Sequence, residues 1–399
     1  MAKLVSATVT ELAGAPGTKE VHFTDDVTVL YGLNGSGKTS LLKILDCAMT
    51  NNVENLLRVP FRTAQVVIVQ DNETIVCTIS KDEFLEKLSA LSSMGLPARE
   101  MTLRQREMYR RLQKGNGGWK YYLDDGKPIG ERFPAGGGES SQSIFPHRYL
   151  PTSRLTSVTE RERSNAGYRE VTEIEYDAIF ASRIERIWEV YSRVELIQER
   201  QIQQEGLAGI FSSVLNGAES DELILHESTR DADAAYTSLL KFFAGQRIPV
   251  NAPKHRFLKR YKEDPLLRTV VSRITEVERL VADAHAPSRK IEQLIDSLYS
   301  GGKKLSLEKE ITIIGSDSQE IAIDVLSSGE KQVLLILLEC LMAKEDVIMI
   351  DEPELSMHVD WQNALIESMR TVNERAQIVL ATHSPEVVAG VPADSIREL

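Results

Sequence analysis

The stretch "GLNGSGKT", residues 32–39, has the residue types and spacing that hold phosphates. Its glycines let the backbone bend so that several amides and the N-terminus of the following helix point at an anion. The pattern places Lys38 at the β- and γ-phosphates of a nucleotide and the Thr39 hydroxyl on Mg²⁺. A chance match in a glycine-rich turn is the alternative, and the flanking apolar strand and helix argue against it. The candidate nucleotide-binding residues are Asn34, Gly35, Ser36, Gly37, Lys38, Thr39 and Ser40.

Two carboxylates far along the chain, in "VIMIDEPELSMH", form a second candidate group. Asp351 ends an apolar strand and can hold Mg²⁺ through water, while Glu352 can orient or deprotonate an attacking water. Acidic residues often end strands, so the pair is weak evidence by itself. Combined with the phosphate loop, it predicts catalytic hydrolysis of a nucleotide.

The stretch "LSSGEKQ", residues 326–332, opens an apolar helix. Serines and a glycine at a helix N-terminus can form another anion site. Because the chain already has one phosphate loop, a second site suggests a nucleotide shared between two chains through Ser327, Ser328, Gly329 and Glu330. The alternative is an ordinary helix cap with Glu330 in the first turn, and the stretch alone favours the cap.

His383 follows a predicted strand in "QIVLATHSPEVV". Ligands of parallel sheets bind at the carboxyl ends of the strands, so the ring could sense a γ-phosphate. A lone histidine is more often structural, but its place after the acidic strand favours the functional interpretation.

The order of these four motifs resembles the Walker A, signature, Walker B with D-loop, and switch-histidine motifs of ABC-type ATPases in the SMC, RecF and OLD branch. The resemblance is specific over residues 1–60 and 305–390. It implies ATP and Mg²⁺ as cofactors, and heads that dimerise head to tail around two ATP molecules. Ser327 and Gly329 would then contact the γ-phosphate bound by Lys38 of the partner subunit.

Two departures from this family pattern concern Ser328 and the glutamine loop. Ser328 stands where the commonest signature has glycine. The glutamine loop has no clear match, since Gln70 ends a strand-like run while "LPTSR", with Arg154, resembles a segment of the OLD-like branch.

The rest of the sequence predicts elements that position these residues. Short alternating runs predict three strands over residues 3–31, and "AQVVIVQDNETIVCTIS" predicts a hairpin turned at "DNE". Residues 82–114 have a charged helical pattern, residues 133–143 a loop composition, and "HRYLPTSRL" a strand and loop. Residues 168–205 and 255–300 predict long helices that pair as a short antiparallel coiled coil.

This order predicts an α/β fold of the P-loop, ABC-type head, with N-terminal antiparallel strands, a mostly parallel central sheet and a helical insertion lobe. The expected domains are residues 1–160 with Walker A, residues 161–304 as the insertion, and residues 305–399 with the signature, Walker B and His383.

Composition favours the cytoplasm and excludes a membrane span. The longest apolar run, residues 332–342, is too short for a bilayer, and the first residues lack a secretory signal. Three isolated cysteines suit a reducing compartment. A net charge of −12 opposes generic binding to nucleic acid, so any such contact must be local.

No nuclease constellation is visible in the chain. The DxD of Asp231 and Asp233 lies within the helical region and follows no apolar strand, so a solvated turn explains it best. A compact ATPase with a helical insertion is similar to the ATPase subunits of two-gene anti-phage systems, PARIS among them. That resemblance implies a homo-oligomer, up to a hexamer, that holds a separate TOPRIM-type nuclease inactive and releases it on sensing a phage-encoded protein.

The alternative is a RecF- or SMC-like ATPase in DNA repair or chromosome maintenance; a transporter ATPase fits poorly because of the insertion. Two basic stretches, residues 104–120 and 254–262, are candidates for binding DNA or an acidic protein. A solvated surface balanced by neighbouring acids is at least as good an explanation for each.

Overall fold

The computed structural model describes residues 1–53, 55–93, 118–129, 144–152, 173–216, 231–245, 249 and 252–399. The chain divides into a head, residues 1–184, 294–304 and 313–399, and a lobe, residues 185–293 and 305–312. The predicted loop at 133–143 and the predicted boundary at residue 160 lie outside the described residues, so the domain boundaries stay predictions.

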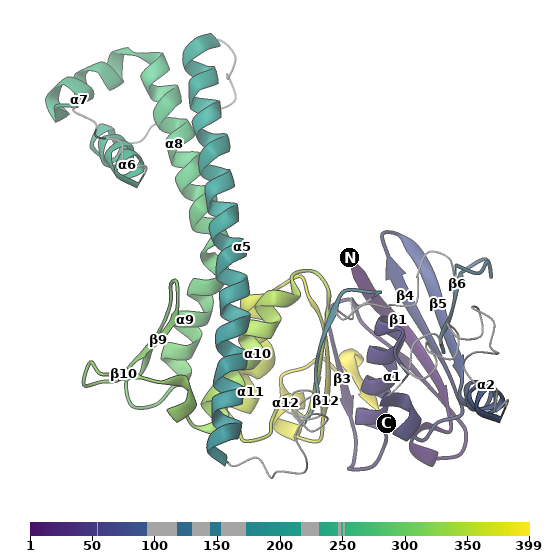
Figure 1. The fold of residues 1–399 in the computed structure, drawn as a ribbon. Coiled ribbons are helices and arrows are strands. Elements are labelled where there is room, and N and C mark those ends of the chain that lie inside the picture. Colours follow the sequence, from purple (N-terminus) through teal and green to yellow (C-terminus); the bar gives the residue numbers. More distant parts are fainter. Residues whose placement is uncertain are drawn as a thin grey trace. The chain divides into compact units, whose positions relative to one another are not determined.

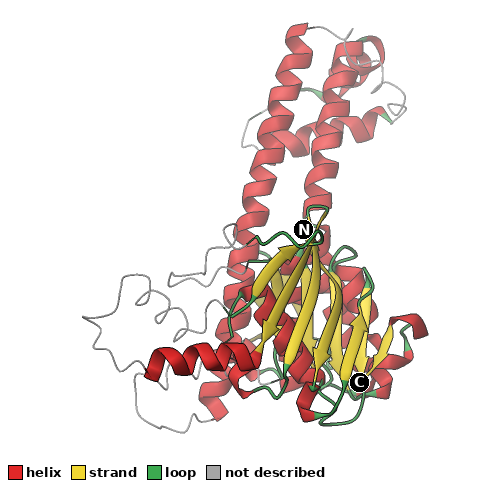
Figure 2. Cartoon of the chain, turned by 90° about the vertical axis from the view of Figure 1, so that its right-hand side faces the viewer, coloured by secondary structure: helices red, strands yellow, loops and turns green. Residues whose placement is uncertain are grey.

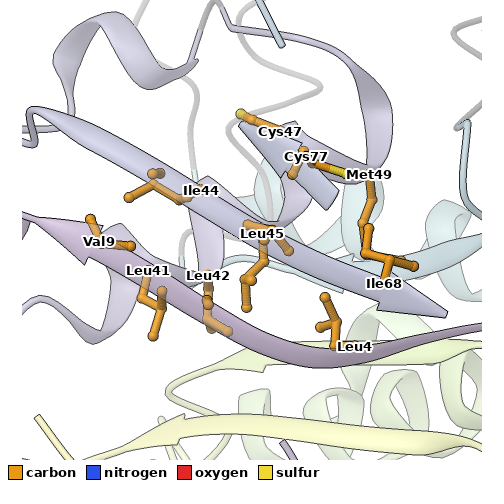
Figure 3. Close-up of a cluster of buried hydrophobic side chains, with 14 of the residues drawn as sticks. Leu4, Val9, Leu41, Leu42, Ile44, Leu45, Cys47, Met49, Ile68 and Cys77 are labelled. Atoms are coloured by element: carbon orange, nitrogen blue, oxygen red, sulfur yellow. The ribbon is translucent and has the colours of Figure 1, made fainter. Parts of the chain in front are cut away.

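An antiparallel sheet of order β2-β1-β4-β5-β6 forms one layer of the head. Its strands are β1 (Ala2–Thr10), β2 (Thr18–His22), β4 (Thr63–Gln70), β5 (Glu73–Ser80) and β6 (Lys120–Leu123). The predicted hairpin is confirmed, with Asp71 and Asn72 in left-handed conformations at the turn between β4 and β5. Side chains of β1, β4 and β5 pack with the buried face of α1, as Figure 3 shows for Leu4, Ile68 and Leu45.

A parallel sheet of order β13-β3-β12-β11-β7 forms the second layer. It contains β3 (Val27–Tyr31), β7 (His147–Leu150), β11 (Val347–Asp351), β12 (Gln377–Thr382) and β13 (Ile396–Glu398). The central strands β11 and β12 are buried at every residue, which explains their unbroken apolar runs. The third of the strands predicted over residues 3–31 is β3. It does not join β1 and β2 in the antiparallel sheet but lies between β12 and β13 in the parallel sheet.

Helices flank the strands of the head (Figure 2). They are α1 (Lys38–Thr50), α2 (Lys81–Ser93), α10 (Ser328–Ala343), α11 (Val359–Val372) and α12 (Pro385–Ala389), with 3₁₀ turns at residues 12–14, 55–58, 323–325 and 393–395. The apolar run near residue 335 forms the buried helix that the sequence predicts, since α10 is enclosed over nearly its whole length. None of the described helices combines the length and the apolar character needed to cross a bilayer.

The helices of the insertion are α5 (Glu173–Asn216), α6 (Ala232–Gly245), α7 (Lys254–Glu263), α8 (Pro265–Ala284) and α9 (Ala286–Leu298). The predicted helix over 255–300 is interrupted where the Asp264 carboxylate accepts from the amides of Leu266 and Leu267, starting a new helix with Pro265 in its first turn. Within the lobe, α5 and α8 run side by side in opposite directions, which confirms the predicted antiparallel pair (Figure 1). A small sheet of order β10-β9-β8 uses residues 320–321, 311–314 and 304–307.

Candidate functional site

Four neighbouring strands of the parallel sheet end at the same edge, where ligands of such sheets bind. Register pairs Tyr31 of β3 with Thr382 of β12, and Asp351 of β11 with Ala381 of β12. The chain continues from these strand ends into the glycine-rich loop, the two carboxylates, His383 and, after β7, Thr152. We call these groups the strand-end site: residues 32–40, Thr152, Asp351, Glu352, Glu354 and His383.

The glycine-rich loop is shaped as a cradle between β3 and α1. Gly35 and Gly37 have φ of 86° and 103°, and a side chain at Gly37 would meet the Leu12 side chain at 2.9 Å. Lys38 is buried, and its ammonium donates to the carbonyl oxygens of Gly32 at 2.7 Å and Leu33 at 3.0 Å. The Ser36 hydroxyl is buried with no hydrogen-bond partner among the described residues. A buried cation and an unsatisfied hydroxyl beside helix-start amides fit a bound phosphate.

Asp351, the last residue of β11, connects this strand to the glycine-rich loop. Its Oδ1 accepts from the Thr39 hydroxyl at 3.0 Å, and its Oδ2 accepts from the Thr152 hydroxyl at 2.5 Å. The carboxylate is only 1% exposed. A hydroxyl and a carboxylate oxygen are ligands that Mg²⁺ prefers, and Mg²⁺ commonly takes few protein ligands because phosphates and water supply the rest. Among the described residues, no group of three or more His, Cys, Asp or Glu side chains is placed to hold a metal ion.

Glu352 and His383 lie close to each other next to Asp351, and Glu354 contacts His383. Glu352 has φ of 48°, and its amide donates to the carbonyl oxygen of Ala381 at 2.8 Å, across to β12. The His383 Nδ1 lies 3.9 Å from Glu352 Oε1 and 3.1 Å from Glu354 Oε1. Glu354 Oε1 also accepts from the Thr382 hydroxyl at 2.6 Å and the His383 amide at 3.0 Å.

Glu354 was missed by sequence reasoning, although it stands two residues after Glu352 in the acidic run. Its carboxylate is buried, and Oε2 has no partner among the described residues. The arrangement therefore places an ionisable ring between two carboxylates. Such a set can hold a water molecule and accept its proton.

The signature stretch forms a complete capping box at the start of α10. Ser327 accepts from the Glu330 amide at 3.3 Å, and Glu330 accepts from the Ser327 amide at 2.9 Å, so the ordinary-cap interpretation is correct as far as it goes. Burial raises the pKa of the Glu330 carboxyl, but hydrogen bonds from Lys303 and Ser327 outweigh it and hold the pKa below its ordinary value. Ser327 and Ser328 nevertheless remain exposed, while a side chain at Gly329 would come within 2.4 Å of the Ser356 carbonyl oxygen. The cap thus leaves two hydroxyls on the surface beside the loop that follows Glu352.

The two glutamine-loop candidates are placed differently. Gln70 ends β4 at a hairpin, paired in register with Ala2 and Glu73 in the antiparallel sheet. The segment after β7 instead brings Thr152 onto Asp351, so the described part of "LPTSR", residues 150–152, reaches the strand-end site. Arg154 lies outside the described residues.

The remaining predicted features fall outside this site. Asp233 pairs with Lys254 at 2.5 Å on the surface, so the DxD is solvated as expected, but Asp233 stands in the first turn of α6 and the expected turn is wrong. In the first basic stretch, residues 104–117 are outside the described residues, and the aromatic side chains Trp119 and Tyr121 are buried in the head core. The aromatic side chains of α7, Phe257 and Tyr261, are buried as well, so these four rings are not exposed for stacking on bases.

Comparison with known families bears on this arrangement. A family model described as "AAA domain, putative AbiEii toxin, Type IV TA system" matches residues 135–389, more than half of the chain. The chain belongs to this AAA family. The match includes the signature, both carboxylates and His383.

Two curated proteins resemble parts of this AAA-family chain. "Retron Vc95 probable ATPase" of Vibrio cholerae serotype O1 biovar El Tor is 29% identical over 101 residues, 22% of this chain and 20% of the relative. "Retron Ec83 probable ATPase" of Escherichia coli is 23% identical over 137 residues, 30% of this chain and 25% of the relative. The chain spans a quarter or less of the length of these relatives.

Solved structures of low identity also align along the chain. The Smc head domain of Pyrococcus furiosus bound to the C-terminal domain of ScpA is 12% identical, with a TM-score of 0.43 over 98% of this chain and 92% of the other. The SMC head domain of Thermotoga maritima is 12% identical, with a TM-score of 0.42 over 99% and 94%.

Proposed function

We propose that this AAA-family chain binds ATP with Mg²⁺ and hydrolyses it at a site that a second copy completes. The observation that carries the proposal is the contact between Thr39 and Asp351, which joins the phosphate loop to the acidic strand across 312 positions of sequence. Bound Mg²⁺ would supply positive charge for the developing negative charge on the phosphates. Thr39 and Asp351 would hold it.

The other side chains of the strand-end site take distinct roles in this proposal. Lys38 and the loop amides bind the phosphates. Glu352 accepts the proton of the attacking water, His383 orients that water against the γ-phosphate, and Glu354 positions the His383 ring. The exposed hydroxyls of Ser327 and Ser328, at the N-terminus of α10, would contact the phosphate held by the partner subunit.

Mutation of two residues tests these assignments. Glu352→Gln should keep ATP binding and lower turnover by about 10²- to 10³-fold, because the general base is lost while the phosphate cradle is intact. Lys38→Ala should weaken ATP binding itself. Binding is measured with a fluorescent ATP analogue, turnover by phosphate release, and ATP-dependent pairing by light scattering. Unchanged turnover in both variants would exclude this site.

For the biological role, we propose a cytoplasmic homo-oligomer that holds a separate nuclease inactive and releases it when a phage-encoded protein is sensed. The support is the resemblance to ATPase subunits of two-gene anti-phage systems such as PARIS, together with the partial similarity to proteins named as retron ATPases. Three free, buried cysteines suit a reducing compartment. Purification of the tagged protein with the products of its neighbouring genes, followed by mass measurement, should recover a TOPRIM-type nuclease; recovery of no nuclease would contradict this role.

A second candidate role, in DNA repair or chromosome maintenance, is favoured by one surface. Helix α7 buries Phe257 and Tyr261 and exposes the cations Arg256, Lys259 and Lys262. Such a row of cations can contact phosphates. ATP-dependent binding to duplex DNA that weakens steeply with salt, and that is lost when these three cations are replaced by Gln, would support this role over the first.

A further inference from the structure

One face of α5 exposes a row of apolar side chains along most of the lobe. Ile197, Phe211 and Leu215 are 64%, 65% and 83% exposed, and Val190 and Val194 are 46% and 44% exposed. The row continues through three smaller or polar residues that are also exposed. Together these positions form the α5 stripe: Val190, Val194, Ile197, Gln201, Gln204, Ala208, Phe211 and Leu215.

The α5 stripe is not the face by which the helix packs inside the lobe. That face carries Glu195, which accepts from the Ser288 hydroxyl at 2.9 Å, and Gly206, which lies directly against Val277 of α8. Ile210 belongs to the core shared with α6, α7 and α8. A surface helix normally has one apolar face and one polar face. The second apolar face of α5 therefore needs another explanation.

The spacing of the α5 stripe is that of a coiled-coil seam. Positions 190, 197, 204 and 211 repeat every seven residues, and positions 194, 201, 208 and 215 repeat with them at the alternating offsets of 4 and 3. These are the d and a positions of four heptads, which is the pattern that buries a helix face against another helix. The two glutamines in the middle are polar seam residues, which specify the register of pairing at a cost in stability.

We propose that the α5 stripe pairs with the α5 stripe of a second copy, antiparallel and centred between Gln201 and Gln204. In that register Gln201 faces Gln204 of the partner subunit, so the polar residues meet each other. Val190 faces Leu215 of the partner subunit and Val194 faces Phe211 of the partner subunit. Ile197 faces Ala208 of the partner subunit, and the same pairs recur on the other side of the twofold axis. The surface is self-complementary, as a twofold interface requires.

Neighbouring registers are less favourable. A shift by one heptad in either direction places the glutamines against apolar residues of the partner subunit, so their amide groups find no polar side chain across the seam. A parallel, in-register pair sets Ala208 against Ala208 and Phe211 against Phe211 of the partner subunit, which combines a void with a crowded layer. The antiparallel register joins a larger to a smaller side chain in each of these layers.

The charges beside the seam permit the same register. Arg193 and Arg200 flank it on one side and would lie near Val214 and Leu207 of the partner subunit. Their apolar stems can cover those residues while the charged ends stay in water. On the other side, Gln198 lies near Glu205 of the partner subunit, and no like charges oppose each other.

A matched pair of variants of the full chain tests the proposal without nucleotide, when ATP-dependent pairing of heads does not contribute. Val194→Glu places a carboxylate in the seam in both copies, and should weaken association by about 100-fold or more in sedimentation measured over a concentration series. Leu196→Glu changes a residue of the same helix with equal exposure, 43% against 44%, outside the seam, and should leave association unchanged. Association that is the same for both variants and the unaltered chain would overturn the proposal. So would a chain that stays monomeric without nucleotide.

Disulfide formation decides the orientation. Cysteines placed together at Val194 and Phe211 should cross-link two copies, because the antiparallel register brings them face to face. Val194→Cys alone should not cross-link, because the two copies of this position would be about 25 Å apart along the helix axis. The natural cysteines described, Cys47, Cys77 and Cys340, are buried and do not interfere. Cross-linking by the single variant would contradict the antiparallel pair, and capture of an unrelated protein in place of a second copy would contradict the choice of occupant.

Discussion

The strand-end site of the head and the α5 stripe of the lobe depart from ordinary burial in opposite ways. In the first, Asp351 and Lys38 are withdrawn from water, at 1% and 5% exposure, while in the second Leu215 is left 83% exposed. Buried charges and exposed apolar rows are the informative exceptions in a folded chain. Each costs stability in a single copy, so each is best explained by binding: of phosphate and metal at the strand ends, and of another helix along α5.

The largest effect argued here is expected at Glu354, which does not contact the reacting atoms itself. If its buried carboxylate positions His383, replacing it should still lower the rate of ATP hydrolysis. Glu354→Ala leaves the Thr382 hydroxyl and the His383 amide without their acceptor and frees the His383 ring. We expect kcat to fall about 10- to 100-fold with little change in KM, since the phosphate cradle is separate. Steady-state phosphate release measures both constants.

Two further variants serve as controls for Glu354→Ala. Glu354→Gln keeps an acceptor oxygen in the same place and should restore part of kcat. Glu386→Ala removes a neighbouring carboxylate whose Oε2 accepts only the Ser384 hydroxyl among the hydrogen bonds described, and should change kcat less than about threefold. Equal losses in Glu354→Ala and Glu386→Ala would show that Glu354 has no special positioning role.

The residues of the strand-end site also differ in how well the sequence alone predicts their place in it. The phosphate loop, with its strand and helix, is local, so spacing alone predicts that Lys38 and Thr39 belong together. Thr152 meets Asp351 from 199 positions away, and only the parallel pairing of β7 with β11 brings them together. In the sequence Glu354 is one acid among several, because its role depends on Thr382 at the end of β12 and on His383 directly after it. Similarly, the exposed face of α5 could not be told from its packed face, because both are apolar at helical spacing.

A smaller effect in the head is expected from a substitution at Gly329, in the first turn of α10. In Gly329→Ala the added carbon would lie 2.4 Å from the Ser356 carbonyl oxygen and 3.2 Å from the Trp361 ring, so the backbone after Glu352 must shift. We expect the free energy of unfolding of the head to fall by about 1–3 kcal/mol, as in other overpacked sites, together with slower ATP turnover. Chemical denaturation followed by circular dichroism measures the first effect. Gly390→Ala is the control, because nothing lies within 4 Å of its added carbon, and an equal loss in the control would remove close packing as the cause.

The smallest changes test how far the packed face of α5 extends, at two glycines three residues apart on the same side of the helix. In Gly206→Ala the added carbon would lie 2.1 Å from a methyl group of Val277, and the stiff valine side chain has little freedom to move away. We expect a loss of about 1–2 kcal/mol in the protection of α5 amides, measured by hydrogen exchange. Gly209→Ala meets nothing within 4 Å and should gain about 0.5–1 kcal/mol from helix propensity. Opposite signs would show that close packing against α8 occurs at Gly206 and does not extend to Gly209; a loss of stability at both glycines would contradict this.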